Sequence, residues 1–195
     1  MVRLFVRKEA VQVKVEPNTV IRGAVFPAVE RDLVGEAQNL FQLFVSVQTL
    51  SKADLFGGKI CAALDRQHPR DLFDVALLLN DEGITEKTRK AFIVYLISHP
   101  RPMHELLNPR FRDFRKTYDN EFLGMVRTPI VYDELLSTRK NLVEIIRMVL
   151  TESERRFLLS LKTGSPDWGL LGTPHVQMLP AVQWKLLNIR NMSLT

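Results

Sequence analysis

The sequence is poor in the features that mark secreted, membrane-embedded or redox proteins. Its 195 residues include one cysteine, so no internal disulfide can form, which is typical of a reducing compartment such as the cytoplasm. No apolar run approaches the roughly 20 residues of a membrane-spanning helix, and the N-terminus lacks the apolar core of a signal peptide. Repeats and low-complexity segments are also missing. We therefore expect a globular cytoplasmic protein with no membrane partner.

Apolar side chains and positive charge are, by contrast, plentiful. Hydrophobic residues make up 46% of the chain, which is ample for a core. The 27 lysines and arginines outnumber the 22 acidic residues and give a net charge of +5. Such an excess permits a polyanionic partner but does not identify one.

The periodicity of apolar residues changes from strands to helices near residue 50. Residues 3–7, 11–16 and 43–48 alternate between apolar and polar side chains, which predicts strands, whereas residues 29–40 are expected to form a short helix. Helical spacing then predicts helices over 58–66, 69–79, 85–98, 132–150 and 151–161. The chain is therefore predicted to be α+β, with a small β region at 1–50 and a mostly helical region at 51–195.

Two helix starts carry capping signals. Ser51 is followed three residues later by Asp54, and Thr151 is followed by Glu154 in the same arrangement. A hydroxyl at the N-cap accepts a hydrogen bond from the backbone three residues on, and an acidic side chain there can reach back. These pairs predict where two of the helices begin.

Charged residues gather where one predicted helix turns into the next. Lys59 and Arg66 are seven residues apart and share a face of the first helix, while Asp71 and Asp74 share a face of the second. Arg70 is four residues before Asp74 and can pair with it. Lysine and arginine suit a triphosphate, and a neighbouring aspartate can orient the cation, hold a metal ion or act as a base.

A purely structural interpretation explains the same charges. Acidic residues in the first turn of a helix oppose its dipole, and an arginine and an aspartate four residues apart often form a surface pair of little value. Spacing alone leaves both interpretations open.

The charged run nevertheless resembles the C-terminal signature of the AbiEii/AbiGii toxin family. That signature is carried here by Lys59, Ala62, Arg66, Arg70, Asp71 and Asp74. The tail at 179–189 is also similar to the family. Its members are nucleotidyltransferase-like toxins of bacterial toxin–antitoxin and abortive-infection pairs, which act in phage defence. The resemblance covers nearly the whole chain, but only the C-terminal two-thirds of the family's usual length.

The resemblance implies a fold, an activity and roles for six residues. Residues 1–50 would be the remnant of a nucleotidyltransferase-like core. The activity would be transfer of a nucleotide from an NTP, with Mg²⁺, to an RNA acceptor, which is tRNA in related toxins, and the cognate antitoxin protein would be a partner. Nucleotide-binding roles fall to Lys59, Arg66 and Arg70, and catalytic roles to Lys59, Asp71 and Asp74. Glu16, at the end of a polar strand face, would be a metal carboxylate; the alternative for Glu16 is a solvated strand end.

One departure from the family limits this interpretation. The superfamily opens with a Gly-Ser pair followed about a dozen residues later by Asp-x-Asp or Asp-x-Glu, and no such combination occurs in the 195 residues. Gly164 and Ser165 are followed by Asp167 and then by no further carboxylate. The expectation is thus an N-terminally incomplete toxin. The alternative is a non-catalytic module that binds RNA or the antitoxin; a DNA-binding regulator ranks last, because no short helix-turn-helix is evident.

Cations alternate with aromatic residues between positions 109 and 118. Such interleaving can bind single-stranded nucleic acid through charge and base stacking. An amphipathic helix with Phe111, Phe114 and Tyr118 facing the core explains the same pattern, and the helical spacing of these three favours it. Trp184 is likewise expected to be a packing residue of the last helix.

Overall fold

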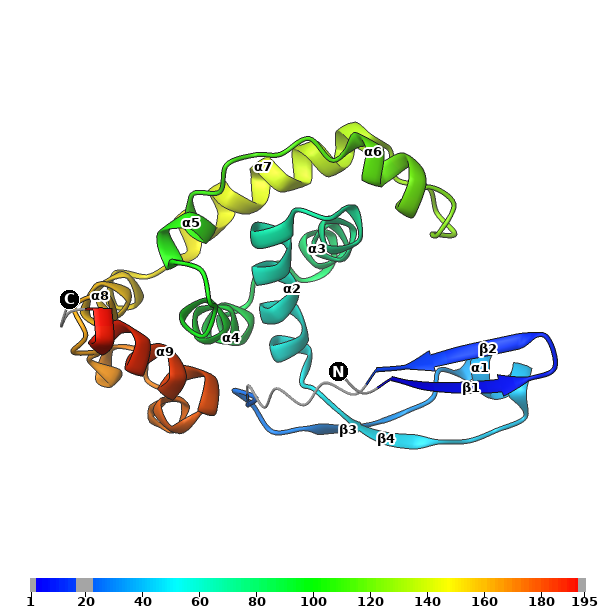
Figure 1. Cartoon of the computed structure of the whole chain (residues 1–195), viewed down its shortest axis with the longest axis horizontal. Coiled ribbons are helices and arrows are strands. Elements are labelled where there is room, and N and C mark those ends of the chain that lie inside the picture. The colour runs from blue at the N-terminus through cyan, green and yellow to red at the C-terminus, as the bar shows by residue number, and fades with distance from the viewer. Residues whose placement is uncertain (1–2, 17–22, 193–195) are drawn as a thin grey trace.

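The computed structural model describes residues 3–16 and 23–192 of the chain (Figure 1). The first elements are β1 (Leu4–Lys8), β2 (Val11–Val15), β3 (Val29–Asp32), α1 (Gly35–Phe41) and β4 (Ser46–Thr49). The later elements are α2 (Lys52–Arg66), α3 (Pro69–Asp81), α4 (Glu86–Ile97), α5 (Met103–Leu107), α6 (Arg115–Thr117), the π-helical turn η1 (Tyr118–Phe122), α7 (Tyr132–Val149), α8 (Glu152–Lys162), the 3₁₀ turns η2 (Trp168–Leu170) and η3 (Pro174–Met178), and α9 (Pro180–Met192). This composition is the predicted α+β fold.

The strands form two separate antiparallel pairs. In β1–β2, Leu4 lies opposite Val15 and Lys8 opposite Val11, and the turn places Glu9 at a positive φ of 54°. In β3–β4, Val29 lies opposite Thr49. The helix expected over 29–40 is therefore wrong in its first half, because residues 29–32 pair with β4; only α1 is helical. Figure 1 shows both pairs, together with α1, extending away from the later helices, and the apolar side chains of β1 and β2 are exposed.

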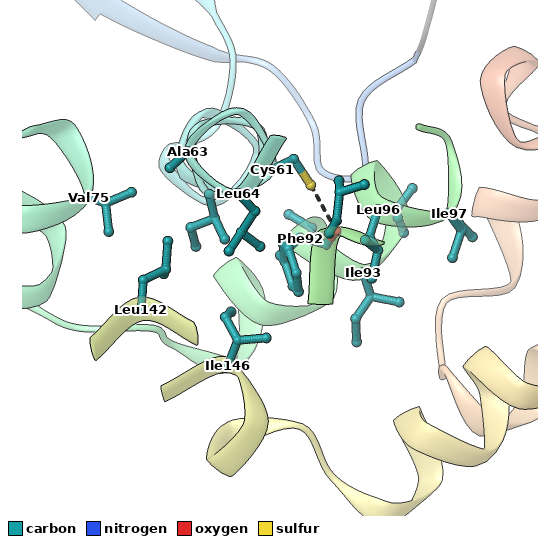
Figure 2. Packing of buried hydrophobic residues seen from close by; sticks show 14 of the residues in the cluster. Cys61, Ala63, Leu64, Val75, Phe92, Ile93, Leu96, Ile97, Leu142 and Ile146 are labelled. Atoms are coloured by element: carbon teal, nitrogen blue, oxygen red, sulfur yellow. Dashed lines mark hydrogen bonds between the residues drawn. The ribbon is translucent and has the colours of Figure 1, made fainter. Parts of the chain in front are cut away.

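Most of the apolar core lies between α2, α3, α4 and α7. Figure 2 shows this packing from close by: Cys61 of α2 lies next to Phe92 of α4, Ala63 lies on the side of Val75 of α3, and Leu142 and Ile146 of α7 lie across from α2. Five α4 residues are fully buried: Ala91, Phe92, Ile93, Leu96 and Ile97. Cys61 is also buried, and its thiol lies 3.7 Å from the backbone oxygen of Phe92. The core thus fixes α2 against α3 and α4.

The helices begin and end close to where the capping signals place them. Ser51 Oγ accepts a hydrogen bond from the Asp54 backbone N–H at 3.0 Å, so α2 begins at Lys52, earlier than the periodicity alone predicts. The Thr151–Glu154 capping box is confirmed, because Thr151 Oγ1 accepts from Glu154 N and Glu154 Oε2 accepts from Thr151 N. Between α2 and α3, Gln67 takes a left-handed conformation and His68 caps α3, whose first residue is Pro69.

Helices α2 and α4 approach each other closely at Gly57. A Cβ atom placed on Gly57 would lie 2.8 Å from the backbone nitrogen of Phe92 and 2.8 Å from the Cβ of Ala91. Gly58, one residue later, has nothing within 4 Å of the same position. Only the first glycine is therefore required for the packing of these two helices.

The C-terminal helices attach to the far end of α4. Lys185 of α9 donates hydrogen bonds from Nζ to the backbone oxygens of His99 at 2.7 Å and Arg101 at 3.1 Å. These carbonyls lie just beyond the C-terminus of α4, where a positive charge is favourable. The expectation that Trp184 packs in the interior is wrong, since it is 48% exposed.

The segment at 109–118 is not the amphipathic helix that its spacing predicts. Only Arg115–Thr117 is α-helical, and the π-helical turn Tyr118–Phe122 follows directly. Phe114 and Tyr118 are buried as expected, but Phe111 is 46% exposed. The backbone at 110–112 is irregular because side chains from α7 and from the α2–α3 turn bind its polar groups.

Candidate functional site

The charged residues of α2 and α3 meet across the two helices. Lys59 Nζ lies 2.5 Å from Asp74 Oδ2, and the two side chains are 37% and 30% exposed. The pair joins α2 to α3 and remains open to solvent, so its contribution to stability is modest. A lysine held in this way can still reach a ligand.

Asp71 pairs with Arg66 one helical turn nearer to the connection between the helices. Arg66 Nη2 donates to Asp71 Oδ1 at 2.9 Å, and Arg66 Nε lies 2.8 Å from Asp71 Oδ2. The Asp71 side chain is only 3% exposed, whereas that of Arg66 is 64% exposed. Asp71 Oδ2 accepts no well-directed hydrogen bond from any residue in the described part of the chain. The guanidinium therefore covers a buried carboxylate, and Asp71 contacts Arg66 and not Lys59.

The predicted pairing of Arg70 with Asp74 is wrong. Asp74 binds Lys59 from the neighbouring helix, and the exposed side chain of Arg70 forms no ion pair with a described residue. The i to i+4 rule concerns partners on one helix, and here a partner on the other helix is held closer by the core. Arg70 is consequently an uncompensated cation on the first turn of α3.

Glu16 pairs with residues of the β1–β2 hairpin and not with this cluster. Its Oε1 is 2.8 Å from Lys14 Nζ and 3.1 Å from Arg3 Nε, both on the β1–β2 hairpin. Each of the three predicted acidic residues thus already has a cation beside it. Across residues 3–16 and 23–192, no group of three or more His, Cys, Asp or Glu side chains is placed to hold a metal ion. A Mg²⁺ ion bound by these carboxylates would take most of its ligands from substrate phosphates and water.

Asp54 is an organising residue whose role the sequence indicated only in part. Its carboxylate, 1% exposed, accepts hydrogen bonds from the backbone N–H groups of Val25 at 2.8 Å and Phe26 at 3.0 Å. It also accepts from Ser51 Oγ at 2.7 Å and from Tyr95 O–H at 3.2 Å. A buried carboxylate is stable only when its lone pairs are satisfied in this way. Asp54 thereby fixes the residue 25–26 loop to α2 and α4.

A second buried network was missed by sequence reasoning. Gln67 Nε2 donates to the backbone oxygen of Arg110 at 2.8 Å, and Gln67 Oε1 accepts from the backbone N–H of Arg112 at 3.1 Å and from Arg139 Nη1 at 3.1 Å. Arg139, 7% exposed, also donates to the backbone oxygen of Arg112 and lies over the ring of Phe111, 4.4 Å from its centroid. Burial lowers the pKa of the Arg139 guanidinium. Arg139 lies three and four residues before Leu142 and Val143 and so shares the apolar face of α7; this position was the sequence signal that could have indicated its burial.

One comparison with known proteins gave a match. A family described as nucleotidyl transferase AbiEii toxin, type IV TA system, matches residues 2–186 of the chain. Neither the curated proteins nor the solved structures contain a match. In the described part of the chain, no helix is both long and apolar enough to cross a membrane.

Proposed function

Because the chain belongs to the AbiEii family of nucleotidyltransferase toxins of type IV toxin–antitoxin systems, we propose that its Lys59–Asp74 pair binds the triphosphate of an NTP in nucleotide transfer to RNA. The observation that carries the proposal is the geometry of this pair. Lys59 is positioned by a carboxylate at 2.5 Å and is about one-third exposed. A lysine ammonium of this kind is a suitable point charge for phosphate oxygens. Arg66 and Arg70, both exposed near the same helix junction, add to the positive field.

The reaction that we propose is attack on the α-phosphorus of the NTP. A hydroxyl of the acceptor RNA, tRNA in related toxins, forms a new P–O bond, the bond between the α-phosphorus and its bridging oxygen breaks, and pyrophosphate leaves. Lys59 and Arg66 would offset the charge that develops on pyrophosphate. Asp74 is the more accessible of the two aspartates, so we assign to it the orientation of Lys59 and acceptance of the hydroxyl proton. Asp71, buried under Arg66, would position that arginine.

The proposal assigns no metal-binding role to this chain, for a physical reason. The Gly-Ser and Asp-x-Asp combination is missing from the 195 residues, and the described carboxylates form no metal cluster. We therefore propose that this chain supplies part of the transfer site. The NTP would arrive as its Mg²⁺ complex, as the family resemblance implies, and no step assigned to these residues depends on the ion.

The test measures NTP binding and label transfer by the full chain and its Lys59→Ala variant. Removing one charge-assisted contact costs about 1.5–3 kcal/mol, so we expect the NTP dissociation constant to rise about ten- to hundredfold. The matched control is Lys52→Ala, because Lys52 is also on α2 and also pairs with α3, through Asp81 at 2.9 Å. Equal NTP affinity in the Lys59→Ala variant and the wild type would contradict the proposal.

The missing carboxylates favour one alternative, a non-catalytic binding module. The type IV toxin–antitoxin family implies an antitoxin partner, and the cationic surface permits RNA as a second one. In this case Lys59 and Asp74 serve only to hold α2 against α3. Salt-dependent binding of tRNA without transfer of label, unchanged by Lys59→Ala, would support the module in place of the transfer site.

A further inference from the structure

Two arginines beside a cavity have no ionic partner among the residues described. Arg110 and Arg112 line a cavity of about 620 Å³ together with Gln67, Arg101 and His104. The one carboxylate in its wall, Glu105, is already bound by Arg101 Nη2 at 2.8 Å and Nε at 3.1 Å. The wall therefore carries an uncompensated positive charge. We call this feature the arginine cavity.

Hydrogen bonds with the side chains of Gln67 and Arg139 hold the backbone that carries these arginines. The oxygen of residue 110 and the N–H of residue 112 both bind the Gln67 amide, as in an extended segment, where backbone groups two residues apart face the same way. Arg110 and Arg112 therefore share one side of the segment. Phe111 lies on the other side, against Arg139. Gln67 and Arg139 thus fix the backbone from which the two arginines extend, so no ordering of this backbone is needed when a ligand binds.

We propose that the arginine cavity binds successive phosphates of an RNA strand. Arginine presents a planar fork that matches phosphate oxygens, and its charge does not titrate near neutral pH. Side chains two residues apart on an extended segment are about 7 Å apart, close to the spacing of neighbouring phosphates along a nucleic-acid strand. An extended acidic peptide can place carboxylates at the same spacing; we favour RNA because it is the acceptor in the proposed function, and poly-glutamate is therefore a competitor in the test.

The position of the cavity relates it to the transfer site. Gln67, in its wall, directly follows Arg66, the last residue of α2. A strand bound there would lie beside the helix junction that carries Lys59, Arg66 and Arg70. The inference rests on the proposed function in identifying this strand as the acceptor, whereas the binding itself is independent of nucleotide transfer.

The experiment measures binding of fluorescently labelled bulk tRNA to the full chain by anisotropy, over a range of salt concentrations. The test variant is Arg110→Gln/Arg112→Gln. The matched control is Arg156→Gln/Lys162→Gln, which removes two charges from the exposed side of α8, where neither side chain has an ionic partner among the described residues. Both variants keep the buried network and have the same net charge.

We expect the test variant to bind tRNA at least tenfold more weakly at 0.15 M salt and to lose about 1.4 from the slope of log affinity against log salt, because each lost phosphate contact on a single strand removes about 0.7. The control should change affinity less than threefold. Equal losses in both variants would overturn the proposal, because they would show an effect of net charge alone. Competition by poly-glutamate as effective as that by unlabelled tRNA would overturn the assignment to RNA.

Two further measurements separate this proposal from the proposed function. Lys59→Ala should bind tRNA as the wild type does, and Arg110→Gln/Arg112→Gln should keep its NTP affinity. Unchanged NTP binding in Lys59→Ala with loss of tRNA binding in the arginine variant would refute the transfer site and keep the cavity. The reverse pattern would refute the cavity and keep the transfer site.

Discussion

Two adjacent glycines in α2 should respond in opposite directions to the same substitution. Alanine is favoured over glycine inside a helix by about 1 kcal/mol. At Gly58 an added Cβ meets nothing within 4 Å, so Gly58→Ala should stabilise the protein by about 0.5–1 kcal/mol. At Gly57 the same atom would lie 2.8 Å from Phe92 N and 2.9 Å from Ala91 C. Because these are backbone atoms of α4, the helices must move apart.

The cost at Gly57 exceeds the gain in helix propensity. Overpacking a well-packed site costs about 1–3 kcal/mol or more, so Gly57→Ala should lower the free energy of unfolding by about 1–2 kcal/mol after the propensity gain. The difference between the two variants should be about 1.5–3 kcal/mol.

Urea unfolding followed by circular dichroism measures both variants under one condition. Equal slopes against urea would show that the shift in midpoint reports stability. A Gly57→Ala variant as stable as the wild type, or changes of the same sign at the two positions, would refute the account of how α2 packs on α4.

Three other substitutions test the buried polar contacts. Asp54→Ala removes the acceptor for four hydrogen bonds and should destabilise the chain by about 3–5 kcal/mol; unprotected amides at Val25 and Phe26 in hydrogen exchange would be its signature. Gln67→Gly relieves a φ of 52° but removes three hydrogen bonds, and urea unfolding should show a net loss of about 1–2 kcal/mol. Burial lowers the pKa of Lys185 below its ordinary value of 10.5. Between the folded and unfolded pKa values the unfolded chain binds more protons, so the contribution of Lys185 to the free energy of unfolding rises with pH. The Lys185→Met variant should lack this rise when urea midpoints are measured between pH 8 and 10 and compared with the wild type.

Local signals in the sequence accounted for most of the helical part. The α2–α3 pair was predicted because its determinants are short-range: the Ser51 cap, the break at His68 and Pro69, and the apolar spacing on either side. The clustering of Lys59 with Asp74 followed from this. The choice of partner for each aspartate could not be predicted, because it depends on how the two helices cross. The spacing along one helix does not determine that crossing.

The errors arose where distant residues decide the backbone. Residues 29–32 form a strand because β4, more than a dozen residues later, pairs with them. Phe111 fits a helical pattern, but Gln67 and Arg139 bind the backbone on either side of it and hold an extended segment. Neither partner is close in sequence, so the periodicity within the segment cannot reveal these hydrogen bonds.

The attachment of Lys185 to the end of α4 has a consequence for the order in which the chain folds. Lys185 and His99 are separated by 86 residues, whereas α2, α3 and α4 follow one another with short connections. Closing a long loop costs more conformational entropy than closing a short one, so the three consecutive helices should assemble first. Until α9 docks, the carbonyls of His99 and Arg101 beyond α4 are left to bind water. The segment after α4 is therefore completed last, by a residue from near the end of the sequence.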